Sequence, residues 1–284
     1  MSEEFTMIAA SSYIPKTRKP PNPAGEDAHF IDQTAQVIGV ADGVGGWARK
    51  GVDAGEYARE LMRNAERSVN GSAPADVDPK SVIAAAFSRT KAAGSSTACI
   101  ISLAGNRLRA ANVGDSGFMV IRRGSIIFRS PAQVWGFNAP YQLERRVRGG
   151  PQAAEEMAVE VESGDVVVAA TDGMFDNLFP EEVEATVERC LSEGMLPPMM
   201  ARELATAAHV KSERRDIESP FAVEAAKARS KWASLGGKRD DITVVVAYII
   251  RALATQPPLQ CRKQGGVVSV QRGVVNAATN LASF

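Results

Sequence analysis

The sequence contains very few histidines and cysteines. Only His29 and His209 occur in 284 residues, which disfavours a histidine-rich metal site and leaves little for a Ser-His-Asp triad. The three cysteines, Cys99, Cys190 and Cys261, are far apart and form no CxxC pair, which argues against a disulfide framework or a thiolate zinc site. We therefore expect any catalysis to depend on carboxylates.

Net charge and long apolar runs are also lacking. Lys plus Arg and Asp plus Glu both number 33, so no overall charge favours nucleic acid or an anionic membrane as partner. No stretch approaches the length of a transmembrane helix, and the start, MSEEFTMIAASSYIPKT, resembles neither a signal peptide nor an Arg-rich transit peptide. We expect a cytoplasmic location for the chain as numbered, or a mitochondrial or chloroplast location if a presequence has been removed.

Hydrophobic periodicity predicts an α+β fold. Short runs rich in Val and Ile indicate buried strands, and very short turns between several of them favour antiparallel sheets over a βαβ alternation. Helical spacing occurs at 55–68, 80–93, 180–191 and 198–210. Strands flanked by helices are typical of a layered domain. The predicted strands are QVIGVA, STACIISL, RLRAANV, FMVIRRG, SIIFR, MAVEVE, DVVVAA and ITVVVAYII.

Composition predicts one domain with an appendage at each end. The Pro-rich segment PKTRKPPNPAG (15–25) cannot be helical, and we assign residues 1–23 to an extended lead-in. Residues 24–251 contain no linker and no internal repeat. Residues 252–284 are rich in Gly, Val and Asn without a clear period, which predicts a loosely ordered tail.

Acidic residues recur where predicted strands begin or end. Asp42 and Asp172 each end a buried run and precede a glycine, and Asp115 follows a third strand. Asp240 and Asp241 stand directly before the strand ITVVVAYII. Because the end of one antiparallel strand lies beside the start of its neighbour, these acids can share one rim of a sheet.

Clustered carboxylates favour a divalent metal site, although each acid also has a simpler interpretation. Asp-Gly is a common turn dipeptide, and Glu26-Asp27 in GEDAHF could be a surface turn. Carboxylates that gather at one rim repel one another unless cations compensate their charge, and Mg²⁺ and Mn²⁺ prefer oxygen ligands. Two such ions roughly 3.5–4 Å apart can activate a bridging water for in-line attack on phosphorus.

Six segments in this order resemble a known family. GEDAHF, ADGVGGW, GSSTACI, ANVGDSG, ATDGMFDN and RDDITVVV are similar to motifs of the metal-dependent type-2C (PPM) protein serine/threonine phosphatases, over about residues 24 to 250. ADGVGGW, GSSTACI and SPFA resemble the organelle-associated branch that is also found in plants. The resemblance implies a four-layer fold, in which helix pairs flank a central antiparallel β-sandwich with a two-metal centre at one edge.

The resemblance also implies roles for individual residues. Asp42 would bridge two Mg²⁺ or Mn²⁺ ions and Gly43 would offer its carbonyl to one of them. Asp172 and Asp240 would be direct ligands of the second ion. A hydroxide that bridges the ions would attack phosphorus, so Asp42, Asp172 and Asp240 would contribute to catalysis through metal-bound water.

Four further acids would complete the site by the same resemblance. Glu26 and Asp27 would hold metal-bound waters. Asp115 and Asp176 are candidates for a weaker third metal ion near the substrate.

Three positions depart from the common family pattern. The position at which many members have a histidine, proposed as general acid, is Val44, and the position of a common arginine after GDS is Gly117. For the phosphate-binding arginine only Arg18, Lys16 and Lys19 are available, with unusual spacing, and a solvated lead-in is an equal interpretation. Val44 indicates a change in the acid, since a metal-bound water could protonate the leaving group.

The sequence favours hydrolysis of phosphoserine and phosphothreonine in proteins by a monomeric enzyme whose partners are phosphoproteins. A catalytically silent protein of the same fold that binds phosphorylated partners is the alternative. A nucleotide-binding enzyme is disfavoured because no GxxxxGK[ST] motif occurs. A substrate-contacting flap is expected within 130–160, where RRVRGG (145–150) could contact a phosphoprotein or form a solvated loop.

Overall fold

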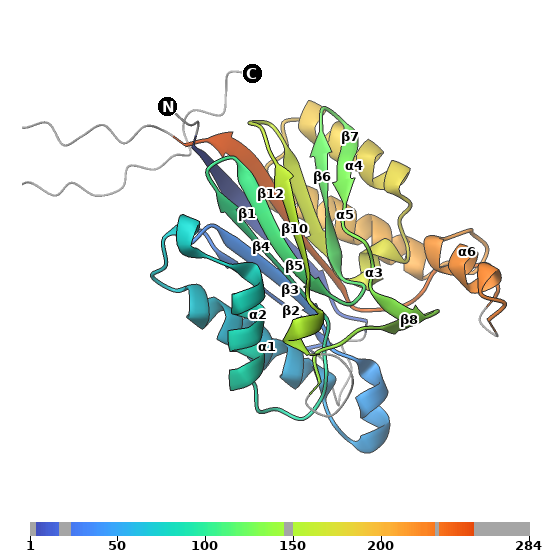
Figure 1. The fold of residues 1–284 in the computed structure, drawn as a ribbon. Helices are drawn as coiled ribbons and strands as arrows, with labels where there is room; N and C mark the ends of the chain where they lie inside the picture. The colour runs from blue at the N-terminus through green and yellow to red at the C-terminus, as the bar shows by residue number, and fades with distance from the viewer. Residues whose placement is uncertain (1–3, 17–23, 145–149, 231–232, 253–284) are drawn as a thin grey trace, which may run out of the picture. The chain divides into compact units, whose positions relative to one another are not determined.

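Two antiparallel sheets pack face to face at the centre of the fold (Figure 1). The computed structural model describes residues 4–16, 24–144, 150–230 and 233–252. In spatial order, sheet 1 consists of β1 (Phe5–Ile14), β12 (Ile242–Arg251), β11 (Val166–Ala170), β6 (Gly117–Arg122) and β7 (Ser125–Arg129). Sheet 2 consists of β10 (Glu155–Glu160), β5 (Arg107–Val113), β4 (Ala98–Ala104), β3 (Val37–Asp42) and β2 (Asp27–Asp32).

Helix pairs cover the outer faces of the sandwich. Helices α1 (Ala54–Val69) and α2 (Pro79–Arg89) pack on sheet 2, and α4 (Pro180–Ser192) and α5 (Pro197–Ser212) pack on sheet 1. Asp53 and Asp78 accept hydrogen bonds from backbone N–H groups in the first turns of α1 and α2, which caps both helices. The short elements are α3 (Asp172–Phe175), α6 (Pro220–Lys227), the pair β8 (Val134–Gly136) and β9 (Ala139–Pro140), and 3₁₀ turns at Gly45–Lys50, Pro74–Asp76 and Pro151–Ala153.

The apolar run of β12 shows why the central strands lack polar alternation. Val244 and Val246 face α4 and α5, whereas Val245, Ala247 and Ile249 face sheet 2. Successive side chains of a strand point to opposite faces, and both faces of this strand are covered. A run without alternation is therefore the pattern expected of a strand between two buried layers.

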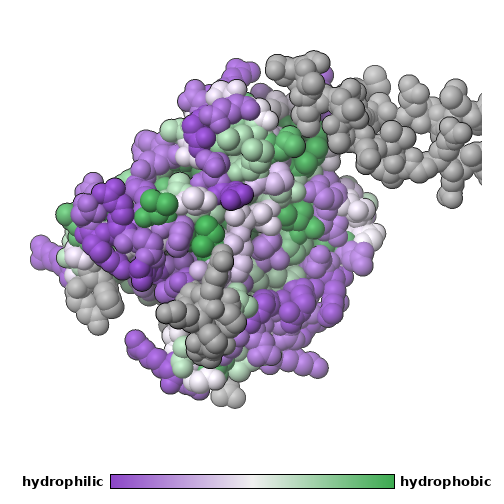
Figure 2. Space-filling view, turned by 180° about the vertical axis from the view of Figure 1, so that it is seen from behind, coloured by the Kyte–Doolittle hydropathy of each residue, from purple (hydrophilic) through white to green (hydrophobic). Residues whose placement is uncertain are grey.

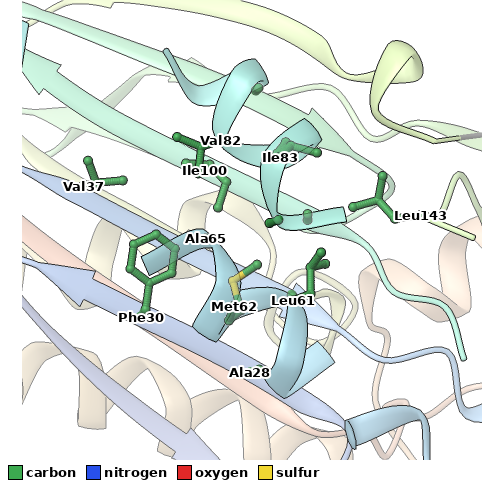
Figure 3. Packing of buried hydrophobic residues seen from close by; sticks show 14 of the residues in the cluster. Ala28, Phe30, Val37, Leu61, Met62, Ala65, Val82, Ile83, Ile100 and Leu143 are labelled. Atoms are coloured by element: carbon green, nitrogen blue, oxygen red, sulfur yellow. The ribbon is translucent and has the colours of Figure 1, made fainter. Parts of the chain in front are cut away.

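The layer between sheet 2 and its helices supports the strand end that carries Asp42. Leu61 and Met62 of α1 and Ile83 of α2 pack against Phe30 and Ile100 of the sheet (Figure 3). Each of these side chains is at most 5% exposed. Truncating a buried Leu or Ile to Ala typically costs about 2–5 kcal/mol, so this layer holds β2 and β3 firmly in place.

The observed elements confirm the α+β sandwich and its flanking helix pairs. The helix expected at 80–93 ends at Arg89, where the Thr90 hydroxyl donates to the carbonyl of Ala86. Residues 5–14, placed in the lead-in by composition, form strand β1, which pairs along its whole length with β12.

Some sequence predictions fall outside the described residues: Arg18 and Lys19, most of RRVRGG and nearly all of the tail. Among the residues that the structure does describe, none of the helices has the length and apolar character needed to cross a membrane. On the face shown in Figure 2, hydrophobic residues lie singly or in small groups among polar ones.

Candidate metal centre

Strand pairing brings the predicted acids to one rim of the sandwich. Asp27 begins β2 directly opposite Asp42 at the end of β3. In sheet 1, Ala170 at the end of β11 pairs with Val244 near the start of β12. Because both sheets end at this rim, residues far apart in sequence meet there.

Three carboxylates form a compact cluster at the rim. Asp42, Asp115 and Asp172 each offer an oxygen, and these oxygens all lie within 4.8 Å of one another. Asp172 is only 7% exposed, and one oxygen each of Asp115 and Asp172 is buried without a hydrogen-bond partner among the described residues. Buried unpaired carboxylate oxygens are costly unless a cation binds them, so the donor set fits a hard divalent metal ion.

Burial and mutual repulsion favour the protonated form of these carboxylates when no cation is bound. Burial, followed by the charges of Asp172 and Asp27, raises the pKa of Asp42 well above its ordinary value. Burial also raises the pKa of Asp172, with Asp240 adding to the effect and Lys238 opposing it. The pKa of Asp115 rises to about 6, again chiefly through burial. A bound cation would reverse this preference for the protonated form.

Two threonines hold Asp27 beside the cluster. The hydroxyls of Thr171 and Thr243 both donate to the same oxygen of Asp27, each at 2.7 Å, and its other oxygen has no partner among the described residues. Burial and then the charge of Asp241 raise the pKa of Asp27 to about 8. The pKa of Glu26 is also raised, first by burial and then by Asp241. The structure therefore places both predicted water-holding acids at the rim, on the β2 side.

The position of Gly43 admits only glycine. Its N–H donates to the Glu26 carbonyl at 3.1 Å, and an added Cβ would lie 2.6 Å from the backbone oxygens of both Glu26 and Ala54. No real side chain tolerates such contacts with backbone atoms. The close approach that the sequence predicts for Gly43 is thus built into the turn, although its carbonyl remains only a predicted metal ligand.

The two neighbouring acids before β12 have different surroundings. The Asp241 carboxylate accepts hydrogen bonds from the Tyr13 hydroxyl at 3.0 Å and from the backbone N–H groups of Lys16 at 2.8 Å and Glu26 at 3.0 Å. Asp240 instead makes ion pairs with Lys238 at 3.1 Å and Lys16 at 3.4 Å. Asp241 therefore orders the segment around Glu26, whereas Asp240 belongs to the charged cluster.

Lys238 is a component of the site that the sequence patterns did not reveal. Its ammonium lies 2.5 Å from Asp172, 2.7 Å from Asp176 and 3.1 Å from Asp240. Lys238 and Asp240 are two residues apart in the extended segment before β12. Residues with this i, i+2 spacing point to the same side of an extended chain, and this spacing could have indicated that Lys238 lies near the acids. Burial raises the pKa of Asp240, but the charges of Lys238 and Lys16 and its hydrogen bonds together outweigh burial and keep that pKa below its usual value.

The GSSTACI segment positions Asp42 through its hydroxyl groups. The Asp42 N–H donates to the Thr97 hydroxyl oxygen at 3.0 Å, and the Thr97 N–H donates to the Asp42 carbonyl at 2.9 Å. The Ser96 hydroxyl donates to the same carbonyl at 2.8 Å. The backbone of Asp42 is thus held on both sides, which limits movement of its side chain.

A cleft of about 830 Å³ adjoins the carboxylate cluster. Its floor includes Asp115, Asp172 and Asp176, and its walls come from the β8–β9 pair and α6, where the rings of Phe137 and Phe221 lie 5.1 Å apart. Position 117, where many family members have arginine, has glycine here because of its surroundings. A Cβ at Gly117 would collide with the Ser130 hydroxyl oxygen, which accepts a hydrogen bond from the Phe118 N–H. The basic residues that line the cleft are Arg129 and Lys227.

Comparisons with known proteins agree with this geometry. No family model matches the chain. It is 44% identical over 249 residues to probable protein phosphatase 2C 55 of Arabidopsis thaliana, covering 87% of this chain and 53% of that protein. It is 41% identical to putative protein phosphatase 2C 24 of Oryza sativa subsp. japonica, covering 86% of this chain and 77% of that protein.

Solved structures show the same fold. The X-ray structure of the photosystem II phosphatase PBCP matches with a TM-score of 0.77 and 34% identity, over 87% of this chain and 100% of that one. The catalytic domain of the serine/threonine phosphatase PstP, solved with two manganese ions, matches with a TM-score of 0.61 and 18% identity, over 87% of this chain and 99% of that one. At this low identity the match supports the fold alone. The chain spans little more than half the length of the first two curated relatives, 53% and 59%. With a relative of 41% identity covered over 77% of its length, the chain belongs to the protein phosphatase 2C family.

Proposed function

We propose that this chain hydrolyses phosphoserine and phosphothreonine esters in proteins with the help of Mg²⁺ or Mn²⁺. The observation that carries the proposal is the cluster of Asp42, Asp115 and Asp172, of which Asp115 and Asp172 line the cleft, in a chain of this family. Buried oxygens without partners give these acids a reason to bind cations. A structural role alone would not require repelling carboxylates to be held together.

In this proposal Asp42, Asp172, Asp240 and the carbonyl of Gly43 hold two ions, and Asp115 with Asp176 faces a further cation. The bound ions would supply Lewis acidity, which activates water for direct attack on phosphorus and neutralises charge on the phosphoryl oxygens. Neither buried cysteine serves as nucleophile, because burial raises the pKa of Cys99 and of Cys190 and both lie in apolar layers.

Residues beside the ligands would hold water and substrate in position. Glu26 and Asp27 accept hydrogen bonds from water at the rim, with Asp27 oriented by Thr171 and Thr243. Val44 cannot donate a proton, so the leaving alkoxide receives its proton from water. We therefore infer that Val44 changes the source of that proton and leaves hydrolysis intact.

The cleft is the proposed binding surface for the phosphorylated segment. Arg18, the predicted phosphate-binding residue, lies outside the described residues, whereas Arg129 lies within them and lines the cleft. The Arg129 guanidinium packs 5.6 Å from the ring of Phe175 and makes no hydrogen bond or ion pair with any residue described. A guanidinium beside the cluster that no described carboxylate pairs with is suited to an anionic group of the substrate.

Phosphate release from a phosphothreonine peptide tests the proposal, with Mn²⁺, with Mg²⁺ and with EDTA. Turnover should require the metal, and Asp172→Asn should lower kcat/KM by more than about 100-fold while the fold is kept. Loss of an outer partner of a metal ligand alone typically costs about 10–100-fold. Glu66→Gln on the exposed part of α1 is the matched control and should behave as wild type.

A folded chain that binds Mn²⁺ but shows no turnover with either metal would refute hydrolysis. That outcome would favour the silent protein that binds phosphorylated partners. An Asp172→Asn variant with full activity would refute the assignment of Asp172.

A further inference from the structure

Two aromatic side chains from separate elements meet in the wall of the cleft. The rings of Phe137, between β8 and β9, and Phe221, in α6, lie 5.1 Å apart with an angle of 47° between their planes. Both side chains line the cleft, and both are only partly buried. Covering such rings with another apolar group is favourable, because it removes further apolar surface from water.

Phe221 is held beside the acids of the metal centre. Its N–H donates to the Asp176 carbonyl at 3.0 Å, and the Ser219 side chain caps the first turn of α6. The Lys238 ammonium lies 2.5 Å from Asp172 and 5.6 Å from the centre of the Phe221 ring. An extended chain advances about 3.3–3.6 Å per residue, so two or three residues span the distance from this carboxylate to the ring.

Phe137 is placed by a tight turn. Only Phe137 and Asn138 connect β8 to β9, and Asn138 has a φ of +52°, a left-handed conformation that asparagine adopts more readily than most residues. The Gln133 N–H, just before β8, donates to the Gly114 carbonyl at 2.8 Å, next to Asp115. Each ring is therefore positioned near the acids by its own element.

The charged residues of α6 that line the cleft compensate each other. Phe221, Glu224 and Lys227 recur every three residues, so they lie on one face of α6, and all three line the cleft. Glu224 and Lys227 form an ion pair at 2.7 Å. A charged occupant would meet no isolated opposite charge on this face, whereas the two rings suit an apolar occupant.

We propose that Phe137 and Phe221 form an apolar subsite that selects the substrate. The inference rests on the proposed function, in which the metal centre receives the phosphate of phosphoserine or phosphothreonine. The occupant of the subsite is a large apolar side chain, such as that of leucine or phenylalanine, within three residues of the phosphorylated one. The substrates are thus phosphoproteins in which an apolar residue, and not a charged one, lies near the phosphorylation site.

The test compares phosphothreonine peptides that differ at a single flanking residue. Leucine, alanine, aspartate or lysine is placed in turn at each of the three positions on either side of the phosphothreonine, and kcat/KM is measured with Mn²⁺. At one position or more, leucine should raise kcat/KM at least about tenfold over each of the other three residues, which is the discrimination typical of an apolar pocket.

Alanine variants of the two rings test the assignment. Phe137→Ala and Phe221→Ala should each reduce the preference for leucine to less than about threefold, and Phe221→Leu, which keeps an apolar wall, should retain most of it. Hydrolysis of N-acetyl phosphothreonine amide, which has no flanking side chain, should stay within about twofold of wild type in all three variants.

Trp135→Ala is the matched control for loss of an aromatic ring. Trp135 belongs to the same β8–β9 pair and is 60% exposed, but it stacks on Tyr141 at 4.0 Å and does not line the cleft. This variant should keep the preference of wild type.

Equal hydrolysis of all the peptides by wild type would overturn the inference, as would a preference for leucine that survives in both alanine variants. Loss of N-acetyl phosphothreonine amide hydrolysis in both variants would also overturn it, because the rings would then support the metal centre itself. If Phe221→Ala does not fold, Phe137→Ala decides, since Phe137 lies on a separate element.

These outcomes separate the inference from the proposed function. Turnover without a preference for leucine would remove only the subsite, whereas absence of turnover with every substrate would remove hydrolysis. In that case fluorescence anisotropy with the same peptides tests the subsite. Equal affinity for the leucine and alanine peptides would refute it, and tighter binding of a leucine peptide that is lost in Phe137→Ala would support it.

Discussion

Asn in place of Asp241 should destabilise the metal-free protein, although Asp241 is not a predicted metal ligand. Its carboxylate is 3% exposed and accepts three hydrogen bonds, with Tyr13 and the Lys16 N–H on one oxygen and the Glu26 N–H on the other. An amide has only one acceptor oxygen. Asp241→Asn would therefore turn its N–H groups toward at least one of these donors.

The expected cost follows from the bonds lost. A hydrogen bond to a charged group contributes about 1.5–3 kcal/mol, and a buried donor left without a partner costs about 1–3 kcal/mol. One bond is lost and the two that remain lose their charge assistance. We expect the free energy of unfolding to fall by roughly 2–4 kcal/mol. Because the Glu26 N–H is released, Mn²⁺ should also bind about tenfold more weakly.

Urea unfolding in EDTA measures the stability change, and Asp240→Asn is the matched control. Asp240 is partly exposed and pairs with Lys16 and Lys238, and its removal also relieves repulsion with Asp172. In EDTA the free energy of unfolding of Asp240→Asn should fall by less than about 1 kcal/mol, whereas its affinity for Mn²⁺ should be reduced. An Asp241→Asn variant that unfolds within about 0.5 kcal/mol of wild type would refute the positioning role of Asp241.

Two further predictions concern pH and the cleft. The pKa of Asp115, raised to about 6, and that of Asp27, raised to about 8, lie above the ordinary value of 3.8, so the folded chain holds these protons to a higher pH than the unfolded chain does. In EDTA the melting temperature should therefore fall as pH rises from 5 to 8. Mn²⁺ should raise the melting temperature more at pH 8 than at pH 5, because fewer protons then compete with the metal for these carboxylates. An equal rise at both pH values would contradict this competition. Arg129→Gln should lower kcat/KM for a phosphopeptide about tenfold, the equivalent of one charge-assisted hydrogen bond. Arg67→Gln on the exposed face of α1 should have no effect, and equal values for both variants would remove Arg129 from substrate binding.

Local sequence patterns predicted most of the elements correctly. β5 and β7 span the runs RLRAANV and SIIFR, and α4 differs from its predicted range by a single residue. β1 was missed because FTMIAASSYI has weak alternation and lies next to a Pro-rich stretch. The strand forms because its full length pairs with β12, which is a tertiary cause.

The pattern of acids predicted the site better than it predicted the role of each acid. Asp240 and Asp241 are neighbours in sequence, and their different surroundings follow from alternation along an extended segment. One side chain points to the charged cluster, and the other points to Tyr13 and Glu26. Sequence spacing cannot show which neighbour receives which environment.

By itself the sequence determined most of the elements and the placement of acids at strand ends, because hydrophobic periodicity and turn chemistry are local. Only the tertiary structure decided which side chains meet. Thr171 reaches Asp27 across 144 positions, and Lys238 reaches Asp172 across 66, because closing the sandwich brings the ends of its strands to one rim. The balance of charge among these groups depends on distances of a few ångströms and on burial, and neither can be read from the order of residues without the folded structure.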